Sequence, residues 1–196
     1  MKLDPVFTVK ENKLYKIDDN SLVEFFFTDV SENDIKKLLD GSIISNAGGA
    51  NSIYNIIISQ KTIEPEYESY SEEFLAELRD ALKVLEEKNL FAVLNIVPGI
   101  DDQNKSKILN GTCEDDAVCE YVACVKHTAR RVKDCVSVAG VFAREDFLTE
   151  GAAGKLMTLE DELLVKHAQY VFFAPNGISE KIKPAGAEYF DRVVLV

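Results

Sequence analysis

Short apolar segments alternate with amphipathic helical patterns along this chain of 196 residues. Three of the segments, "NSIYNIIIS" (51–59), "LFAVLNIV" (90–97) and "VSVAGVFA" (136–143), are apolar on both faces of an extended strand. Such strands need cover on both faces, and helices between consecutive strands make a sheet parallel. The pattern predicts an α/β fold with about six parallel strands, the other three lying at 22–30, 170–174 and 192–196.

Helical patterns fill the intervals between these strands. The segment "SENDIKKLLDG" (31–41) begins at a serine cap and stops at a glycine. Further helices are expected at 69–89, 114–132 and 158–168, and the first of these carries one continuous apolar face. Ahead of the first strand, "FTVKENKLYKID" alternates apolar and polar residues around a turn, which predicts a β-hairpin within residues 1–20 that acts as a lid or plug.

The length accommodates one sizeable core, so residues 1–196 are expected to form a single domain. Both an open doubly wound sheet and a barrel fit the alternation of strands and helices. A glycine-rich phosphate loop would favour the open sheet. The one glycine cluster, "NAGGAN" (46–51), precedes a strand and lacks both the dinucleotide fingerprint and a Walker lysine. Nucleotide binding is therefore not supported.

The net charge of the chain indicates which classes of partner are not expected. The chain has 22 Lys and Arg against 34 Asp and Glu, a formal charge of −12 and a pI near 4.7. That balance repels phosphate backbones and anionic membrane surfaces, so neither nucleic acid nor a membrane is an expected partner. No signal-like or membrane-spanning apolar run is present, and we expect a cytoplasmic protein.

The cysteines and histidines give no metal or cofactor signal. Cys113, Cys119, Cys124 and Cys135 lack the two-residue gap of zinc knuckles and redox motifs, and they are interpreted as reduced core thiols. The C-x-x-H formed by Cys124 and His127 supplies only two ligands. His167 has no accompanying nucleophile pattern and is interpreted as a helix-end residue. We expect neither a metal nor a cofactor.

Four segments together resemble family 5 glycoside hydrolases, the cellulase and mannanase barrels. The opening "FTVKENKLYKIDDNSLVEFFFTDVS" is similar to the hairpin and first strand of that family, and "GANSIYNIII" is similar to its second strand. The run "EEFLAELRDALKVLEEKNLFAVLNIVPG" resembles its next helix and third strand, and "SVAGVFARED" its fourth. The match runs in the right order from about residue 6 to about residue 147. It implies a partial or shortened TIM-type (β/α) barrel.

The resemblance also assigns a site. In such barrels the chemistry lies at the carboxyl ends of the strands, where "VAGVFAREDF" places three adjacent charges. Glu145 falls on the position of the family's acid/base glutamate, and Tyr54, Asn95, Arg144 and Asp146 are the candidate substrate-binding residues. The alternative interpretation is that the three charges only mark where a strand leaves the core.

The family's other polar residues are not retained. The site arginine, the histidine after the third strand and the asparagine before the acid/base fall on Tyr54, Val97 and Arg144. A retaining glycosidase also needs a second carboxylate at about 5 Å from the first. Glu188 in "GAEYF" resembles the nucleophile motif but stands at the wrong place in strand order. Asp29 and Asp101 are the other strand-end carboxylates.

Eight β/α units typically need about 250 residues, so a full barrel does not fit into this chain. We therefore expect a degenerate glycoside-hydrolase-like protein that binds carbohydrate or serves as an interaction protein without catalysis. The alternative is an active retaining O-glycosidase that uses Glu145 as acid/base, and an ordinary open sheet is the alternative to barrel ancestry. Tyr54, Tyr67, Tyr70 and Phe147 could stack on sugars, although the chain has no Trp. Unpaired strand edges favour a homodimer, or burial of the last strand against the first.

Overall fold

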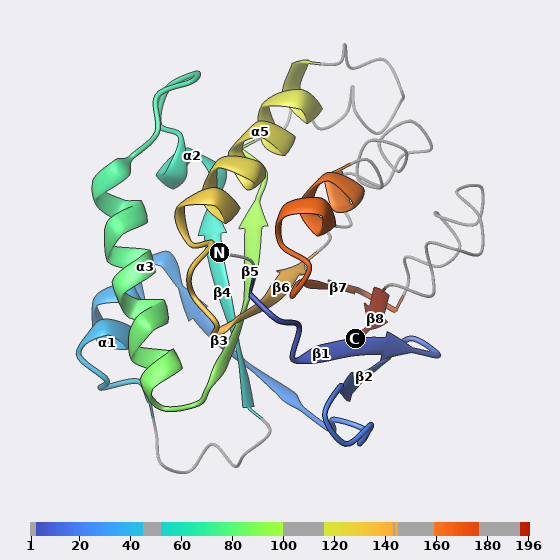
Figure 1. Ribbon diagram of the computed structural model, residues 1–196. Coiled ribbons are helices and arrows are strands. Elements are labelled where there is room, and N and C mark those ends of the chain that lie inside the picture. The colour runs from blue at the N-terminus through green and yellow to red at the C-terminus, as the bar shows by residue number, and fades with distance from the viewer. Residues whose placement is uncertain (1–2, 45–51, 100–115, 143, 145–158, 177–192) are drawn as a thin grey trace.

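The computed structural model describes residues 3–44, 52–99, 116–142, 144, 159–176 and 193–196 (Figure 1). Its main feature is a six-stranded sheet in which the strands follow one another in chain order and each neighbouring pair is parallel. The strands are β3 (Phe26–Ser31), β4 (Ser52–Ser59), β5 (Phe91–Val97), β6 (Val138–Phe142), β7 (Val171–Ala174) and β8 (Val193–Leu195). The prediction of a partial α/β barrel with six parallel strands is confirmed.

Helices cover one face of this sheet. They are η1 (Glu32–Asp34), α1 (Ile35–Leu39), α2 (Gln60–Ile63), α3 (Glu72–Glu87), α5 (Asp116–Arg131) and a helix over residues 159–166. The longest, α3, begins where the Ser71 hydroxyl accepts a hydrogen bond from the Phe74 amide at 3.4 Å. Its apolar face is buried as the spacing predicts, through Leu75, Leu78, Ala81, Leu82 and Leu85.

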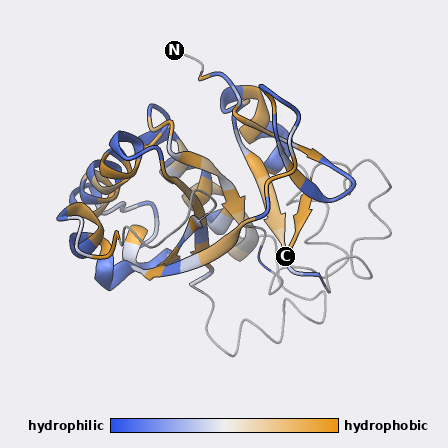
Figure 2. Cartoon of the chain, turned by 90° about the horizontal axis from the view of Figure 1, so that it is seen from below, coloured by the Kyte–Doolittle hydropathy of each residue, from blue (hydrophilic) through white to orange (hydrophobic). Residues whose placement is uncertain are grey.

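The two faces of the sheet belong to two separate cores. Even-numbered residues of β4 and β5, such as Ile56 and Leu94, pack with the helices in the larger cluster. Odd-numbered residues, such as Ile53 and Val93, pack in a second cluster on the helix-free face. Because side chains alternate along a strand, this division fixes which face each strand residue occupies. Figure 2 shows the strands as largely hydrophobic and the outer surfaces of the helices as largely hydrophilic.

The sheet curls around its helix-free face, as a barrel wall does. The ring of Phe27 on β3 lies 5.7 Å from the ring of Phe173 on β7 and 6.1 Å from that of Phe142 on β6. Phe25 contacts the same ring of Phe173 at 5.8 Å. Contacts between the first and fifth strands of a sheet require it to bend back on itself. The interior is therefore filled by aromatic side chains and is not a pore.

The predicted hairpin is present as β1 (Phe7–Lys10) and β2 (Lys13–Lys16). Glu11 and Asn12 form its two-residue turn, with φ values of 51° and 59° that match a tight hairpin turn. Phe7 and Leu14 are buried in the helix-free core, so the hairpin plugs the barrel interior. In Figure 1 it lies beside β8 and the carboxyl terminus.

The barrel does not close by pairing β8 with β3. Instead, the Asn12 side-chain amide donates to the Val193 carbonyl at 3.0 Å, and the Leu195 amide donates to the Asn12 carbonyl at 3.2 Å. Val193 and Val194 are buried, as expected for the last strand, but the hairpin tip provides the cover at its edge. Pairing of the last strand with the first, one of the two expected routes, is therefore not the arrangement of these strands, and packing on a second subunit stays a prediction.

Gly140 sets the spacing between β6 and β7. A Cβ atom on this residue would lie 1.7 Å from the backbone oxygen of Val171, which is far inside contact distance. The pairing of β5 with β6 also shifts register here, since Ala92 pairs with Val138 and Val93 pairs with Gly140. This bulge returns Phe142 to the barrel interior, and with it the residue two positions later, Arg144.

The expectation of core thiols holds for two of the three described cysteines. Cys124 and Cys135 are buried, and burial raises the pKa of each to about 12. Cys119 is exposed, and Cys113 lies outside the described residues. Among the helices that the structure describes, none has the length and apolar character needed to cross a bilayer.

A candidate site at the carboxyl ends of the strands

Four polar side chains lie on the interior face of the curled sheet, between the middle and the carboxyl end of neighbouring strands. We call them the strand-end row: Asp29 on β3, Asn55 on β4, Asn95 on β5 and Arg144 just after β6. The first three follow the inward residues Phe27, Ile53 and Val93 by two positions, which puts them on the same face. Asn55 lies level with its register partner Val93 in the apolar interior, and the row extends from there to Arg144, at the end of a (β/α) barrel where ligands bind.

Asn55 and Asp29 form the first pair of the row. They are register partners, and the Asn55 amide donates to Asp29 Oδ1 at 2.8 Å. Asn55 is only 7% exposed, and its side-chain oxygen accepts no hydrogen bond from a described residue. A buried acceptor without a donor costs free energy, so it calls for an explanation such as a ligand that supplies the donor.

Arg144 and Asn95 form the second pair. Nη1 of Arg144 donates to Oδ1 of Asn95 at 3.1 Å, and Asn95 is only 4% exposed. The Arg144 side chain thus extends from the end of β6 toward Asn95 on the neighbouring strand β5. The guanidinium is planar and carries five N–H donors in a fixed geometry. Sequence reasoning named both of these residues, and the structure brings them together.

Tyr54 is not part of this row. Its ring is 2% exposed and lies in the helix-side core, on the opposite face of β4 from Asn55. Burial raises the pKa of its phenol. The sequence analysis did not name Asn55 as a site residue. Because side chains alternate along a strand, Asn55 shares the interior face with Ile53, but the sequence does not show which face of β4 is interior. Val97 is on the interior side of β5, two residues after Asn95.

Several residues named from the sequence lie outside the described part of the chain. These are Glu145, Asp146 and Phe147, together with the further carboxylates Asp101 and Glu188. In the sequence, Arg144 immediately precedes Glu145, the expected acid/base residue. Asp29 is the one carboxylate of the strand-end row. The row by itself therefore supplies hydrogen-bond acceptors and donors, and it does not contain the pair of carboxylates that a glycosidase needs.

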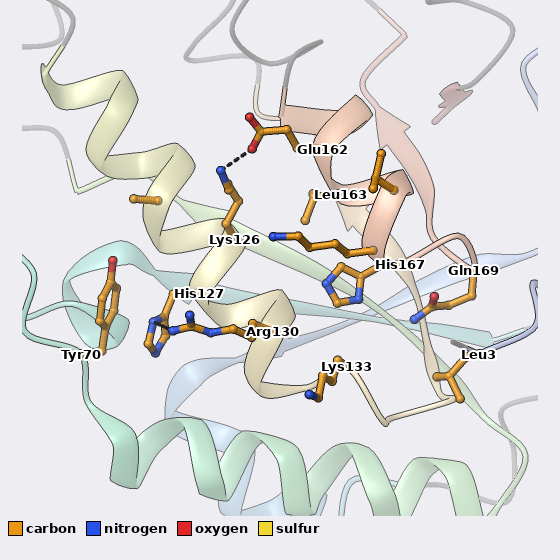
Figure 3. A pocket seen from close by; sticks show the side chains of 13 residues that line it. Leu3, Tyr70, Lys126, His127, Arg130, Lys133, Glu162, Leu163, His167 and Gln169 are labelled. Atoms are coloured by element: carbon orange, nitrogen blue, oxygen red, sulfur yellow. Dashed lines mark hydrogen bonds and ion pairs between the residues drawn. The ribbon is translucent and has the colours of Figure 1, made fainter. Parts of the chain in front are cut away.

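A cavity of about 650 Å³ lies elsewhere, in a groove between α5 and the helix over residues 159–166 (Figure 3). His127, Arg130 and Lys126 line it, and each already has a partner. The Arg130 guanidinium lies 2.9 Å from Nδ1 of His127, whose Nε2 lies 3.2 Å from a Glu72 carboxylate oxygen. Lys126 is paired with Glu162. This groove is on the helix side of the sheet, away from the strand-end row.

Both histidines of that groove are held against tyrosine rings. The ring of His127 stacks on Tyr70 at 3.7 Å, and that of His167 stacks on Tyr170 at 4.9 Å. Burial lowers the pKa of both histidines, which favours the neutral rings. Within the described ranges no group of three His, Cys, Asp or Glu side chains is placed to hold a metal ion.

Comparison with known proteins supports the fold. No protein-family model matches the sequence, and no curated protein matches it. Among solved structures, endo-glycoceramidase II from Rhodococcus sp. in a cellobiose-like imidazole complex superposes with a TM-score of 0.62 at 11% identity, over 86% of this chain and 51% of that one. GH5_18 from Streptomyces cattleya in complex with GlcNAc superposes with a TM-score of 0.55 at 9% identity, over 79% and 45%.

These neighbours are family 5 enzymes, so the resemblance inferred from the sequence is confirmed at the level of the fold. The chain spans about half the length of the structures it matches. It therefore has the fold of a partial α/β barrel, with the tip of the hairpin against the edge of β8.

Proposed function

We propose that this protein binds a carbohydrate at the strand-end row and does not hydrolyse it. The observation that carries the proposal is the buried side-chain oxygen of Asn55, which lacks a donor among the described residues. Sugar hydroxyl groups both donate and accept hydrogen bonds, so one of them could satisfy this oxygen while another accepts from Arg144. The row offers both kinds of partner within one end of the barrel.

The structural neighbours support a sugar as the ligand class. Endo-glycoceramidase II was captured in a cellobiose-like imidazole complex and as a lactosyl-enzyme intermediate, and GH5_18 was captured with GlcNAc. At 9 to 12% sequence identity the likeness extends only to the fold. The proposal that this chain also binds a sugar therefore rests on the strand-end row. Ligands of (β/α) barrels bind at this end of the strands.

The absence of turnover is proposed from the departures from the family pattern. Val97 and Arg144 replace a histidine and an asparagine that the resemblance leads one to expect, and Tyr54 lies on the helix side of β4. The competing proposal is a retaining glycosidase with Glu145 as acid/base. The observation that favours the glycosidase is Asp29 on β3, because it is a carboxylate in the strand-end row and a retaining glycosidase needs a second carboxylate in addition to Glu145.

A binding experiment tests the first part of the proposal. Cellobiose, lactose and GlcNAc would be titrated into the labelled protein and followed by amide chemical shifts. We expect shifts at Asn55 and Asn95, and weaker binding in Asn95→Ala and Arg144→Gln. Asn89→Gly is the matched control, because Asn89 is exposed at the far end of α3 with a φ of 54° that glycine tolerates. Binding unchanged in both row variants would reject the strand-end site.

A turnover experiment tests the second part. Hydrolysis of aryl glucosides, aryl mannosides and β-glucans should stay at the background rate in the wild-type protein. Activity that is present in the wild type and lost in Glu145→Gln would establish the glycosidase alternative. Sugar binding to a folded protein without hydrolysis would support the binding role.

A further inference from the structure

A second site is indicated by Glu64, which follows α2 at the carboxyl end of β4. The side chain is 8% exposed. One carboxylate oxygen, Oε1, accepts a hydrogen bond from the Glu68 amide at 2.8 Å. The other oxygen, Oε2, is buried and accepts no hydrogen bond from a described residue. No described Lys, Arg or His side chain lies within ion-pair distance of it.

Glu64 lines a cavity of about 520 Å³ between the segment that follows α2 and the amino-terminal half of α5. In Figure 1, α2 and this half of α5 lie at the end of the sheet toward which β4 and β5 point. The described lining is Glu64, Tyr67, Glu68, Tyr70, Cys119, Glu120 and Ala123. Three of these seven residues are acidic and none is basic, so the cavity repels anions and attracts cations.

The wall of the cavity at Tyr70 is fixed by packing. The Tyr70 ring stacks on that of His127 with an interplanar angle of 8°. Figure 3 shows the two side chains next to each other. Burial and then the nearby Glu64 raise the pKa of the Tyr70 phenol, which places the glutamate's charge close to this ring. A second ring, Tyr67, is 70% exposed at the same cavity. The site thus combines carboxylates with aromatic side chains.

We propose that this cavity binds an organic ammonium ion, with Glu64 as the principal counter-charge. A bound ammonium would donate hydrogen bonds to the Glu64 carboxylate and compensate a buried charge that otherwise costs stability. Tyrosine rings attract cations through their π faces, and Glu68 and Glu120 add negative charge around the opening. This inference is independent of the proposed carbohydrate site.

The lining favours an organic cation over a metal ion. The described residues provide no group of three His, Cys, Asp or Glu side chains with metal-binding geometry. The cavity volume of about 520 Å³ falls within the size range of small-molecule pockets and greatly exceeds that of a bare ion. An amine carried by a polyamine and one carried by an amino sugar present the same ammonium group, so both sources must be tested.

The experiment measures binding of putrescine and glucosamine to the full chain by calorimetry at 150 mM salt, with Mg²⁺ and neutral GlcNAc as comparison ligands. We expect binding of at least one ammonium compound with a stoichiometry of one. Preference for putrescine would indicate a polyamine, and preference for glucosamine would indicate an amino sugar. Binding of Mg²⁺ in place of both amines would overturn the proposal, and so would a failure of both amines to bind.

Glu64→Gln is the decisive variant, because it removes the charge and keeps an oxygen that can accept from the Glu68 amide. Ammonium binding should weaken about tenfold or more, while the melting temperature should stay equal or rise since an uncompensated buried charge is lost. Glu87→Gln is the matched control, being an exposed carboxylate at the far end of α3. A lower melting temperature with unchanged ammonium affinity would show that Glu64 is structural only.

The variants also separate the two proposals. Asn95→Ala lies in the strand-end row and should leave ammonium binding unchanged. Glu64→Gln should in turn leave neutral sugar binding unchanged. Loss of ammonium binding in Asn95→Ala would place the amine at the strand-end row and overturn the assignment to Glu64.

Discussion

The side chain of Asn12, at the tip of the amino-terminal hairpin, donates to the carbonyl of Val193 in the last strand, 181 residues away. The Leu195 amide returns a hydrogen bond to the Asn12 carbonyl. Val196, by contrast, donates toward β7, to the carbonyl of Ala174. Asn12 thus occupies the Val193 carbonyl and the Leu195 amide, the two backbone groups to which a further strand would bind. The hairpin performs the edge protection that a closed barrel obtains from its next strand.

Asn12→Gly should weaken this edge without disturbing the turn. Glycine accepts the φ of 59° and keeps the backbone carbonyl, while the side-chain hydrogen bond to Val193 is lost. We expect a loss of about 1 kcal/mol in the free energy of unfolding and more self-association in size-exclusion chromatography. Asn89→Gly makes the same change at a positive φ in an exposed turn and should lower stability less. Equal effects of the two variants would contradict a special role for Asn12.

Gly140→Ala tests the close approach of β6 and β7. The added methyl group would meet the Val171 carbonyl at 1.7 Å, and two paired strands cannot separate without losing their ladder. We expect a loss of about 3 kcal/mol or more in the free energy of unfolding, measured by denaturant titration. Ala139→Gly, at the preceding residue, removes a methyl group without a clash and should cost less. A stable Gly140→Ala protein would show that the sheet can shift at this bulge.

The ion pair of Arg79 with Asp134 makes a prediction for acid solution. Two hydrogen bonds of 2.5 and 3.1 Å join the side chains, and they lower the pKa of Asp134 from 3.8 to about 2. A depressed carboxyl pKa means that the pair stabilises the fold fully above about pH 4 and loses this contribution as the pH falls toward 2. The side chains are 45 and 46% exposed, so solvent screening limits the contribution to about 0.5 kcal/mol.

Asp134→Asn should therefore lower the free energy of unfolding at pH 7 by about that amount, and the difference from wild type should vanish near pH 2. Denaturant titrations at pH 7, 4 and 2 measure this difference, and high salt should reduce it at pH 7. A difference that persists unchanged at pH 2 would mean that the asparagine disturbs packing and not charge.

The order and direction of the strands could be predicted from the sequence, because apolar runs and amphipathic helices report burial directly. The orientation of individual β4 residues could not. In "SIYNIIIS" apolar residues occupy both faces, so the alternation that would separate Tyr54 from Asn55 is hidden. The resemblance placed a site residue at Tyr54, whereas the helix-side packing of that ring leaves Asn55 on the interior face.

The contacts made by Asn12 and Glu64 could not be predicted from the sequence, because they depend on tertiary packing. A turn residue such as Asn12 is recognisable from sequence by its position between two alternating strands, but its bonds to Val193 and Leu195 depend on the curl of the whole sheet. Glu64 stands in a polar segment that gives no sign of burial. Only the packing of α5 against that segment makes its carboxylate a buried group.

His167 gives the fold a second dependence on pH, near neutrality. Burial, and then Lys166 and Lys133, lower its pKa from the ordinary 6.5, so the native state holds the ring neutral more firmly than the unfolded chain does. As the pH falls below about 6.5 the unfolded chain gains the proton first, so stability must decrease with acidification. His127 is shifted in the same direction and adds to the effect.

His167→Phe isolates the contribution of His167. Phenylalanine keeps a flat ring against Tyr170, which lies 4.9 Å away, and it cannot titrate. We expect the free energy of unfolding to fall less steeply between pH 7.5 and 5.5 in this variant than in the wild type, with the remaining slope due partly to His127. His127→Gln should remove that second part. The same slope in wild type and His167→Phe would mean that His167 takes up a proton as readily in the folded protein as in the unfolded chain. The groove between α5 and the helix over residues 159–166 would then be more open to water at His167 than its 5% exposure indicates.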